Sequence, residues 1–284
     1  MTMEYIPYKS KLYPDLLRDI ASPPTCLYLV GTIPELPMVS IVGSRALTEY
    51  GQYMTYRLAY DLAKAGFCIV SGMALGVDAI AHKAALEAGG ATLAVLAGGL
   101  DSPSPRSNYW LFERILASGG GVISEYPAGA TPFKQNFPAR NRIIAGLSLA
   151  TIITEANASS GSLITANFAL QANRMIMAVP GNVTSPRSAG PNNLLKLGAK
   201  PVTDAVDVLT ELGLASEALA PKTVRADSAE EATIMELIGN GHHTTAALIE
   251  KSDIEASSIA SILSLMEITG KVRNIGSGQW ILTS

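Results

Sequence analysis

The residues best suited to binding chemistry lie together in the stretch 134–146, KQNFPARNRIIAG. Its members that can contact a ligand are Lys134, Phe137, Arg140, Asn141 and Arg142. Cations hold phosphates and an aromatic ring stacks a base, so this combination is typical of a single-stranded nucleic-acid site. The alternative is structural: each arginine pairs with a carboxylate from elsewhere in the fold and Phe137 is a core residue.

Charge is distributed unevenly along the chain. Between Glu125 and Asp204 the sequence has seven basic residues and a single acidic one, Glu155, although the whole chain of 284 residues has a net charge of −3. Residues 223–284 carry four basic against eight acidic side chains. A basic middle segment suits a polyanion, whereas the C-terminal part is acidic.

Composition narrows the classes of protein to consider. A chain of 284 residues is long enough for one large or two ordinary domains. Its longest apolar run, residues 91–100, is half of the ~20 residues that a membrane span needs, and the N-terminus lacks the apolar core of a signal peptide. We therefore expect a cytoplasmic protein without a membrane partner. Cys26 and Cys68 do not form a metal-type spacing, so no metal site is expected.

Short apolar strands alternate with helical patterns from residue 39 to residue 181. The strands are predicted at 39–43, 67–72, 92–99, 122–125, 150–156 and 174–181, and the helices at 52–66, 76–90, 108–121, 141–148 and 162–173. A lead-in over residues 1–36 contains a short helical pattern and the strand CLYLVG. The alternation predicts an α/β fold: a Rossmann-like, mainly parallel sheet with helices on both faces.

Small and polar residues follow several of these strands. The strand exits are Gly43-Ser44-Arg45, Ser71-Gly72, the loop Asn157 to Ser162 with Ser160 and Gly161, and Pro180-Gly181-Asn182. In a parallel sheet these exits meet at one edge, where ligands bind. Backbone N–H groups and hydroxyls at such positions attract anions, although glycine and serine are also common turn and N-cap residues.

The C-terminal part reads as a separate domain. We expect a core at 1–212, a linker at 213–227 and a winged-helix-like domain at 228–284, with three helices and a hairpin that turns at 276–278. The third helix contains no lysine or arginine, whereas a helix that reads DNA needs cations and donors. This domain is therefore expected to serve protein interaction or regulation, with Lys271 and Arg273 as its only plausible DNA contacts.

Catalytic patterns are weak. Asp78 and His82 are four residues apart on a predicted helix, where a structural hydrogen bond is favoured over a catalytic pair. The sequence has neither GxxxxGK[ST] nor GxGxxG after the first strand, so ATP hydrolysis and NAD use are not expected. We predict a protein without catalytic residues or a cofactor.

With these motifs in view, the chain resembles the bacterial DNA-processing protein A family (DprA, also called Smf). The resemblance rests on IVGSRALTEYG, VSGMALGVDAIAHKAAL, SEYP, FPARNRIIAGLS, SGSLITA and AVPG, which occur in the family's order between residues 13 and 209. It implies a single-stranded DNA-binding protein that forms homodimers and loads the RecA recombinase during natural transformation. It also implies that Arg45 and Lys134 grip phosphates and that Phe137 stacks a base, whereas some of Arg140, Asn141 and Arg142 brace the pocket.

Three departures from the family pattern stand out. Only a short lead-in precedes the core, where many members have an N-terminal helical module. The usual Tyr-Pro after GLD is Ser104-Pro105, and the basic residue common before SGSL is Ser159. Either substitution is expected to weaken the grip on DNA modestly.

The reading we adopt is a non-catalytic mediator in which Lys134, Arg45 and Arg142 hold the DNA backbone and Phe137 stacks a base. A second hypothesis is a nucleotide-processing enzyme like the lysine-decarboxylase-like phosphoribohydrolases, whose PGGxGT segment is replaced here by EANASSGSLITA. A third is a protein-binding module whose basic surface meets an acidic partner.

Overall fold

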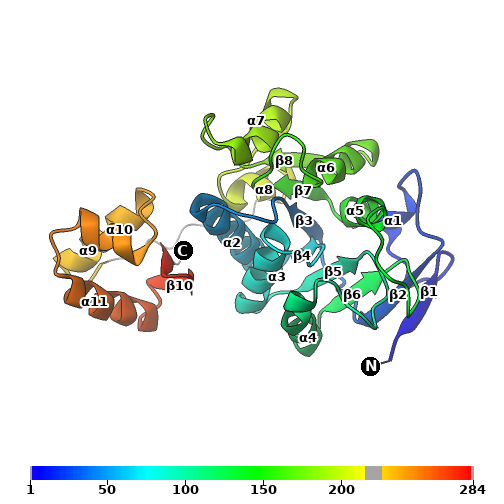
Figure 1. The fold of residues 1–284 in the computed structure, drawn as a ribbon, viewed down its shortest axis with the longest axis horizontal. Coiled ribbons are helices and arrows are strands. Elements are labelled where there is room, and N and C mark those ends of the chain that lie inside the picture. Colours follow the sequence, from blue (N-terminus) through cyan, green and yellow to red (C-terminus); the bar gives the residue numbers. More distant parts are fainter. Residues whose placement is uncertain (1, 215–225, 283–284) are drawn as a thin grey trace. The chain divides into compact units, whose positions relative to one another are not determined.

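The chain folds into two compact units, residues 1–216 and 217–284, in the computed structural model (Figure 1). The structure describes residues 2–214 and 226–282, so most of the predicted linker at 213–227 lies outside the described residues. In the described ranges, no helix combines the length and the apolar character that crossing a bilayer requires.

The larger unit alternates strands and helices as the sequence predicts. Its strands are β1 (Glu4–Pro7), β2 (Cys26–Gly31), β3 (Met38–Val42), β4 (Cys68–Ser71), β5 (Thr92–Leu96), β6 (Gly121–Ser124), β7 (Ala150–Ile153), β8 (Met175–Ala178) and β9 (Lys200–Pro201). Its helices are α1 (Asp15–Arg18), α2 (Glu49–Lys64), α3 (Val77–Glu87), α4 (Tyr109–Ala117), α5 (Asn136–Leu147), α6 (Ser162–Gln171), α7 (Ala189–Lys196) and α8 (Ala205–Glu211). Two 3-10 turns, Arg106–Asn108 and Pro186–Ser188, precede α4 and α7.

All nine strands form one sheet in the order β1-β2-β6-β5-β4-β3-β7-β8-β9. Across the sheet, the neighbouring strands from β6 through β5, β4, β3, β7 and β8 to β9 pair in parallel. Strand β2 runs antiparallel to its two neighbours, β1 and β6. From β3 the chain first builds outward through β4, β5 and β6, and then returns to place β7 on the other side of β3. The boundary between β3 and β7 is therefore a topological switch point, where the loops leave in opposite directions and open a crevice.

Helices cover both faces of this sheet. Helices α2, α3 and α4 pack together on one face, while α1, α5 and α6 pack on the other. The central strands β3, β4 and β5 are buried along their whole length, as expected for strands covered on both sides. The predicted Rossmann-like fold is confirmed.

Helix α5 differs from its prediction. The sequence predicted a helix at 141–148, but the structure begins it at Asn136, five residues earlier. Pro138 lies in the first turn of the helix, where its missing N–H costs no intrahelical bond. The extension matters because it places Phe137 and Arg140 on a helix instead of a loop.

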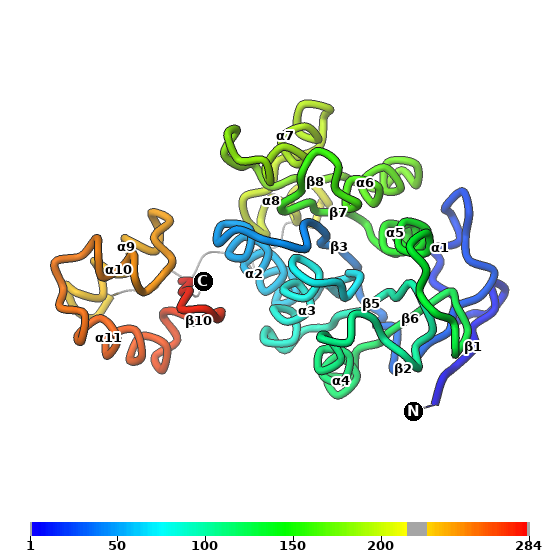
Figure 2. The backbone as a smooth tube through the Cα atoms, in the orientation of Figure 1, coloured from blue at the N-terminus to red at the C-terminus, as the bar shows by residue number. Residues whose placement is uncertain are grey.

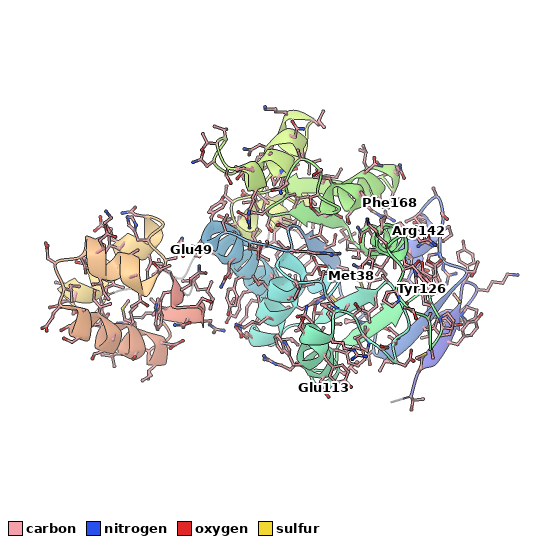
Figure 3. The ribbon with its side chains drawn as sticks, in the orientation of Figure 1. Met38, Glu49, Glu113, Tyr126, Arg142 and Phe168 are labelled. Atoms are coloured by element: carbon pink, nitrogen blue, oxygen red, sulfur yellow. The ribbon has the colours of Figure 1, made fainter. Side chains whose placement is uncertain are left out.

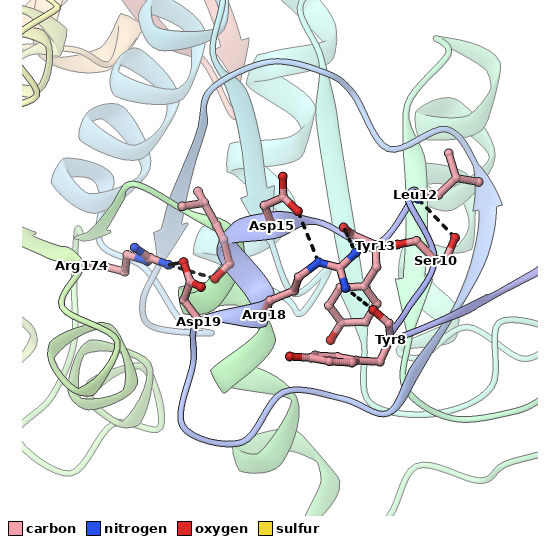
Figure 4. A network of polar contacts seen from close by, with 9 residues as sticks. Tyr8, Ser10, Leu12, Tyr13, Asp15, Arg18, Asp19 and Arg174 are labelled. Atoms are coloured by element: carbon pink, nitrogen blue, oxygen red, sulfur yellow. Dashed lines mark hydrogen bonds and ion pairs between the residues drawn. The ribbon is translucent and has the colours of Figure 1, made fainter.

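The N-terminal segment is tied together by Arg18 (Figure 4). Its guanidinium donates hydrogen bonds to the backbone carbonyls of Tyr8, Ser10 and Tyr13, and its Nε donates to Asp15 at 3.2 Å. The same group lies 5.0 Å from the centroid of the Tyr13 ring. These contacts hold the lead-in in one conformation beside the sheet.

Helix α1 packs against α5, and Figure 2 shows the two helices side by side. Leu17 and Ile20 share a buried cluster with Ile143 and Leu147 of α5. A Cβ at Gly146 would lie only 2.7 Å from Cγ2 of Ile20, so this close approach needs a glycine. The lead-in thus supports the helix that carries the 134–146 cluster.

The smaller unit has the three helices and the hairpin that the sequence predicts. They are α9 (Ala229–Gly239), α10 (Thr245–Lys251), α11 (Ala256–Ile268), β10 (Val272–Gly276) and β11 (Gln279–Leu282). Ser228 and Thr244 cap α9 and α10 through their hydroxyls. Trp280 belongs to the core of this unit and donates its Nε1–H to the Thr245 hydroxyl at 2.9 Å.

Candidate nucleic-acid interface

A pocket of about 650 Å³ opens at the switch point between β3 and β7. Ten of the eleven residues predicted for the site line it: Gly43, Ser44, Arg45, Lys134, Phe137, Arg140, Asn141, Ser160, Gly161 and Ser162. Three segments far apart in the sequence contribute, namely the loop after β3, the start of α5 and the loop that leads into α6. The remaining predicted residue, Arg142, is not among the lining residues.

The loop after β3 is held by backbone contacts that require glycine. Ser44 donates its N–H to the carbonyl of Glu155 at 2.6 Å and accepts the N–H of Val77 at 3.1 Å. A Cβ at Gly76, whose φ is +79°, would lie 2.3 Å from the Ser44 carbonyl oxygen. This fixed loop leaves Arg45 exposed at the mouth of the pocket.

Glu155, the lone acid of the basic segment, stabilises the same loop from beneath. Its carboxylate accepts the backbone N–H of Thr48 at 3.0 Å and also the Thr48 hydroxyl. Thr48 is the N-cap of α2, so the negative charge also lies at the positive end of that helix. Glu155 is 2 % exposed and does not line the pocket, so its charge serves the loop and not the cations at the pocket.

The first turn of α5 brings a ring and cations together. Arg45 lies with its guanidinium carbon 5.6 Å from the centroid of the Phe137 ring, which is half-buried. Lys134 precedes the helix and is exposed. The pocket thus combines an aromatic ring with positively charged side chains.

The opposite wall is the N-terminus of α6. Ser160 and Ser162 share a hydrogen bond of 2.8 Å between their hydroxyls, and Asn141 donates its amide to the Gly161 carbonyl at 3.3 Å. The first-turn N–H groups of a helix of this length attract anions, and they lie here at a pocket with two exposed cations.

Arg140 has a different role from Arg45. It is 5 % exposed, and its guanidinium donates to the carbonyls of Gly72, at 2.7 Å, and Val95, at the carboxyl ends of β4 and β5. Burial lowers the pKa of Arg140 to about 10, and the positive charge of Arg45 adds to this, while Asp78 opposes it. At neutral pH Arg140 is a buried cation that braces the floor of the pocket.

Asp78 lies at the same floor. Its Oδ2 accepts the backbone N–H groups of Gly72 at 3.1 Å and Ala74 at 3.3 Å. Burial raises the pKa of the Asp78 carboxyl, and the positive charge of Arg140 counteracts that shift. The sequence did not mark Asp78 as a pocket residue, because its partners lie in a loop and on a distant helix.

Arg142 lies elsewhere, and Figure 3 labels it near Tyr126. Its guanidinium forms an ion pair with Glu125 at 2.5 Å and donates to the carbonyls of Ser22 and Ala139. Successive residues of a helix point about 100° apart, so Arg140, Asn141 and Arg142 cannot all face one pocket. The expectation that Arg142 holds the DNA backbone must be corrected: it ties α5 to the lead-in and to the segment after β6.

Asp78 and His82 do not form the pair considered from the sequence. The Nδ1 of His82 lies 2.6 Å from the Thr92 hydroxyl, which itself donates to the carbonyl of Ile69. His82 therefore donates from Nδ1, and burial lowers its pKa to about 3. Within residues 2–214 and 226–282, no group of three or more His, Cys, Asp or Glu could hold a metal ion.

In the small unit, Lys271 is not available to DNA. It is 7 % exposed, and its Nζ lies 2.5 Å from both Asp227 and Glu231. These carboxylates raise the pKa of Lys271, with Asp227 contributing first. Of the two DNA contacts considered for this domain, Lys271 is thus paired with carboxylates inside the unit.

Known proteins are similar to this chain in sequence and in fold. The family model described as DNA recombination-mediator protein A matches residues 4–213. The Smf protein of Synechocystis is 44% identical over 207 residues, which cover 71% of this chain and 52% of the relative. The DNA processing protein DprA of Bacillus subtilis is 40% identical over 210 residues, covering 73% of this chain and 70% of the relative.

Solved structures agree. The X-ray structure of DNA processing protein A from Streptococcus pneumoniae has a TM-score of 0.70 at 40% identity, with 74% of this chain and 75% of that chain covered. That of Helicobacter pylori, described for its single-stranded DNA-binding mode, has a TM-score of 0.67 at 33% identity, with 75% and 96% covered. The chain spans about half the length of the first curated relatives. With its core matched over residues 4–213, the chain belongs to the DNA recombination-mediator protein A family.

Proposed function

We propose that this protein binds single-stranded DNA in the switch-point pocket and delivers it to a RecA-type recombinase. The observation that carries the proposal is the placement of Arg45, Lys134 and Phe137 around one pocket. Cations that follow a phosphate backbone, beside a ring that stacks a base, are the two elements of single-strand recognition. A duplex keeps its bases stacked inside, so the ring favours single strands.

The phosphate-binding part of the proposal rests on exposure. Arg45 and Lys134 are exposed at the pocket, whereas Arg140 is buried against the Gly72 carbonyl and Arg142 is paired with Glu125. Each phosphate neutralised by an exposed cation releases counterions, which makes binding salt-dependent. Such contacts position the strand without reading its sequence.

Family membership supports the finer parts of the proposal. The matched model is described as a recombination mediator, and the related Helicobacter pylori protein is described as binding single-stranded DNA. On this basis we propose delivery to RecA during recombination and transformation, and a homodimer in which two linked sites raise the effective concentration of the second engagement.

We propose that the small unit serves protein interaction. Lys271 is neutralised by two carboxylates. Helix α11, the third helix, which would read DNA in a winged-helix domain, carries no basic residue. Without cations, the helix has no means to hold phosphates on either side of a groove.

We also propose binding without catalytic turnover. The carboxylate of Asp78 accepts backbone N–H groups and His82 is fixed by Thr92, so each has a structural partner. An assay for free base released from nucleoside monophosphates tests this point. Release above the buffer control would instead favour a phosphoribohydrolase-type enzyme.

Phe137→Ala tests the binding proposal directly. Loss of a base-stacking ring should cost about 1–3 kcal/mol of single-strand affinity without changing the salt dependence. Phe133→Ala is the matched control, because Phe133 is 63 % exposed and does not line the switch-point pocket. Equal single-strand affinities for the two variants, measured by fluorescence anisotropy, would refute the stacking role.

A further inference from the structure

Helix α4 carries an exposed tryptophan that lies outside the switch-point pocket. Trp110 is 43 % exposed in the first turn of the helix, beside Tyr109, which is 45 % exposed. Neither residue lines the pocket. Because tryptophan is highly buried on average in folded proteins, an indole this exposed beside a second aromatic ring is typical of a binding surface.

The two rings differ in their contacts. Tyr109 is stacked on the buried Phe112, with the ring centroids 5.9 Å apart and 19° between the ring planes. Trp110 has instead the guanidinium of Arg114, one turn later, whose carbon lies 5.9 Å from the ring centroid. In the described part of the chain, Trp110 stacks on no other ring and its indole N–H has no hydrogen-bond partner. The indole can therefore both stack on a ligand and donate to it.

The charges four residues before and after Trp110 are positive. Arg106 and Arg114 are both exposed, and within residues 2–214 and 226–282 neither guanidinium pairs with a carboxylate. Glu113, labelled in Figure 3, is exposed as well. Residues four apart share a face of a helix, so Arg114 lies on the side of Trp110 and Glu113 on the side of Tyr109. The Trp110 side of α4 thus combines a stacking ring with a cation, as single-strand sites do.

The start of α4 is tied to the wall of the switch-point pocket. Asn108, directly before the helix, is buried and donates its amide to the carbonyls of Met73 at 2.8 Å and Ala74 at 3.2 Å. Ala74 lines the pocket. Consecutive Cα atoms are 3.8 Å apart, so Trp110 lies within roughly 15 Å of this wall. A strand that leaves the pocket on this side reaches Trp110 after a few nucleotides.

We propose that Trp110 and Arg114 form a second contact for single-stranded DNA, the α4 contact, in which a base stacks on the indole and a neighbouring phosphate is held by Arg114. The inference rests on the proposed single-strand binding and adds the direction in which the strand leaves the pocket. Tryptophan and arginine are also enriched at protein interfaces. The short path to the pocket and the unpaired guanidinium favour the strand over a protein partner.

Trp110 itself reports the contact. The sequence has two tryptophans, so Trp280→Phe leaves Trp110 as the sole one. A base that stacks on an indole quenches its fluorescence. A thymidine strand of about 12 nucleotides should quench Trp110, whereas one of about four nucleotides, at the short end of usual single-strand site sizes, should bind in the pocket and leave the emission unchanged.

Substitutions measure what the contact contributes, by fluorescence anisotropy of labelled strands. Trp110→Ala should weaken the long strand about fivefold, the lower end of the range for one stacked base, and leave the short strand within about twofold. Trp110→Phe keeps a ring and should restore most of the long-strand affinity. Arg114→Ala should lower the salt slope by about 0.7 for the long strand alone. Tyr5→Ala is the matched control and should behave as the wild type, because Tyr5 is 58 % exposed on β1, which β2 and β6 separate from β5.

The outcomes separate the two proposals. If the long strand leaves the Trp110 emission unchanged at saturation, or binds Trp110→Ala as tightly as the wild type, the α4 contact is refuted while single-strand binding in the pocket stands. The exposed rings of α4 would then serve a protein partner. Equal losses for the short and the long strand would show that Trp110 supports the pocket, and would also overturn the α4 contact. If the wild type binds neither strand, both proposals fail.

Discussion

Arg45 and Arg140 line the same pocket, but replacing one should affect DNA binding and replacing the other should affect stability. Arg140→Ala deletes a buried guanidinium that donates to the carbonyls of Gly72 and Val95. It also deprives the buried Asp78 carboxylate of the positive charge that holds its pKa down. We expect a large loss of stability, whereas Arg45→Ala should chiefly weaken DNA binding.

The magnitude follows from burial. Hydrogen bonds to a charged donor contribute about 1.5–3 kcal/mol each, and an uncompensated buried charge costs about 3–5 kcal/mol. Because these contributions overlap, Arg140→Ala should lower the free energy of unfolding by about 3–5 kcal/mol. Arg45 is exposed, so its substitution should change stability by less than about 0.5 kcal/mol.

Urea unfolding measures both values. Trp110 lies in the larger unit and Trp280 in the smaller one, so a Trp280→Phe background makes fluorescence report the larger unit alone. An unchanged dependence on urea concentration would show that the unfolding transition is the same in each variant.

The pH dependence gives a second signature. Without Arg140 the pKa of the Asp78 carboxyl rises further above its unfolded value, so the folded state gains stability from protonation as the pH falls. The gap between Arg140→Ala and the wild type should therefore narrow between pH 7 and pH 5. A loss below about 1 kcal/mol at pH 7 would refute the bracing role of Arg140.

Three further predictions concern buried groups. In the folded protein the pKa of His82 is lowered to about 3, below the ordinary value of about 6.5, so the free energy of unfolding falls as the pH drops below about 6.5. Between pH 7 and pH 5 the wild type should lose about 2 kcal/mol more of this free energy than His82→Gln, measured by thermal or urea unfolding. Gly72→Ala should lower the free energy of unfolding in urea, because the added Cβ would lie within 2.6 Å of the Arg140 guanidinium. A free energy of unfolding equal to that of the wild type would show that the Arg140 side chain can move aside. Lys271→Ala should destabilise the small unit, as measured by Trp280 fluorescence, and should leave the affinity for single strands within twofold of the wild type. Lys251→Ala, at an exposed position, should change neither the stability nor the affinity.

The α/β fold was predictable because its signal is local. Continuous apolar strands such as β3 and helices with apolar periodicity, such as α2, can be identified within ten to twenty residues. The same applies to the strand exits, since a loop that follows a parallel strand must lie at one edge of the sheet. The convergence of Ser44 and Ser160 on one pocket followed from that rule.

Partners distant in sequence were not predictable. Arg142 looks equivalent to Arg140 in the string RNR, yet one pairs with Glu125 and the other supports β4 and β5. The two side chains differ because residues two apart on a helix point in different directions, and both positions lie on α5 because the helix begins at Asn136. Lys271 likewise looks like a wing cation until Asp227, 44 residues earlier, is found beside it.

The central claim is that exposed cations at the switch-point pocket hold a single strand. The control is Lys64, which is exposed in the last turn of α2. The other end of α2, its N-cap Thr48, contacts Glu155 just after β7, at the edge of the sheet where the pocket opens. The 16 residues of α2 separate Lys64 from this edge by about 24 Å. Lys64 is therefore more than two Debye lengths from that edge at 0.1 M salt, where the Debye length is about 10 Å.

The most direct measurement is the salt dependence of single-strand affinity for the wild type, Lys134→Ala and Lys64→Ala. One lost phosphate contact should reduce the slope of log K against log salt by about 0.7 for Lys134→Ala. Lys64→Ala should keep the wild-type slope and affinity. Slopes that are equal for the wild type and Lys134→Ala, or changed equally in both variants, would contradict phosphate binding at this pocket.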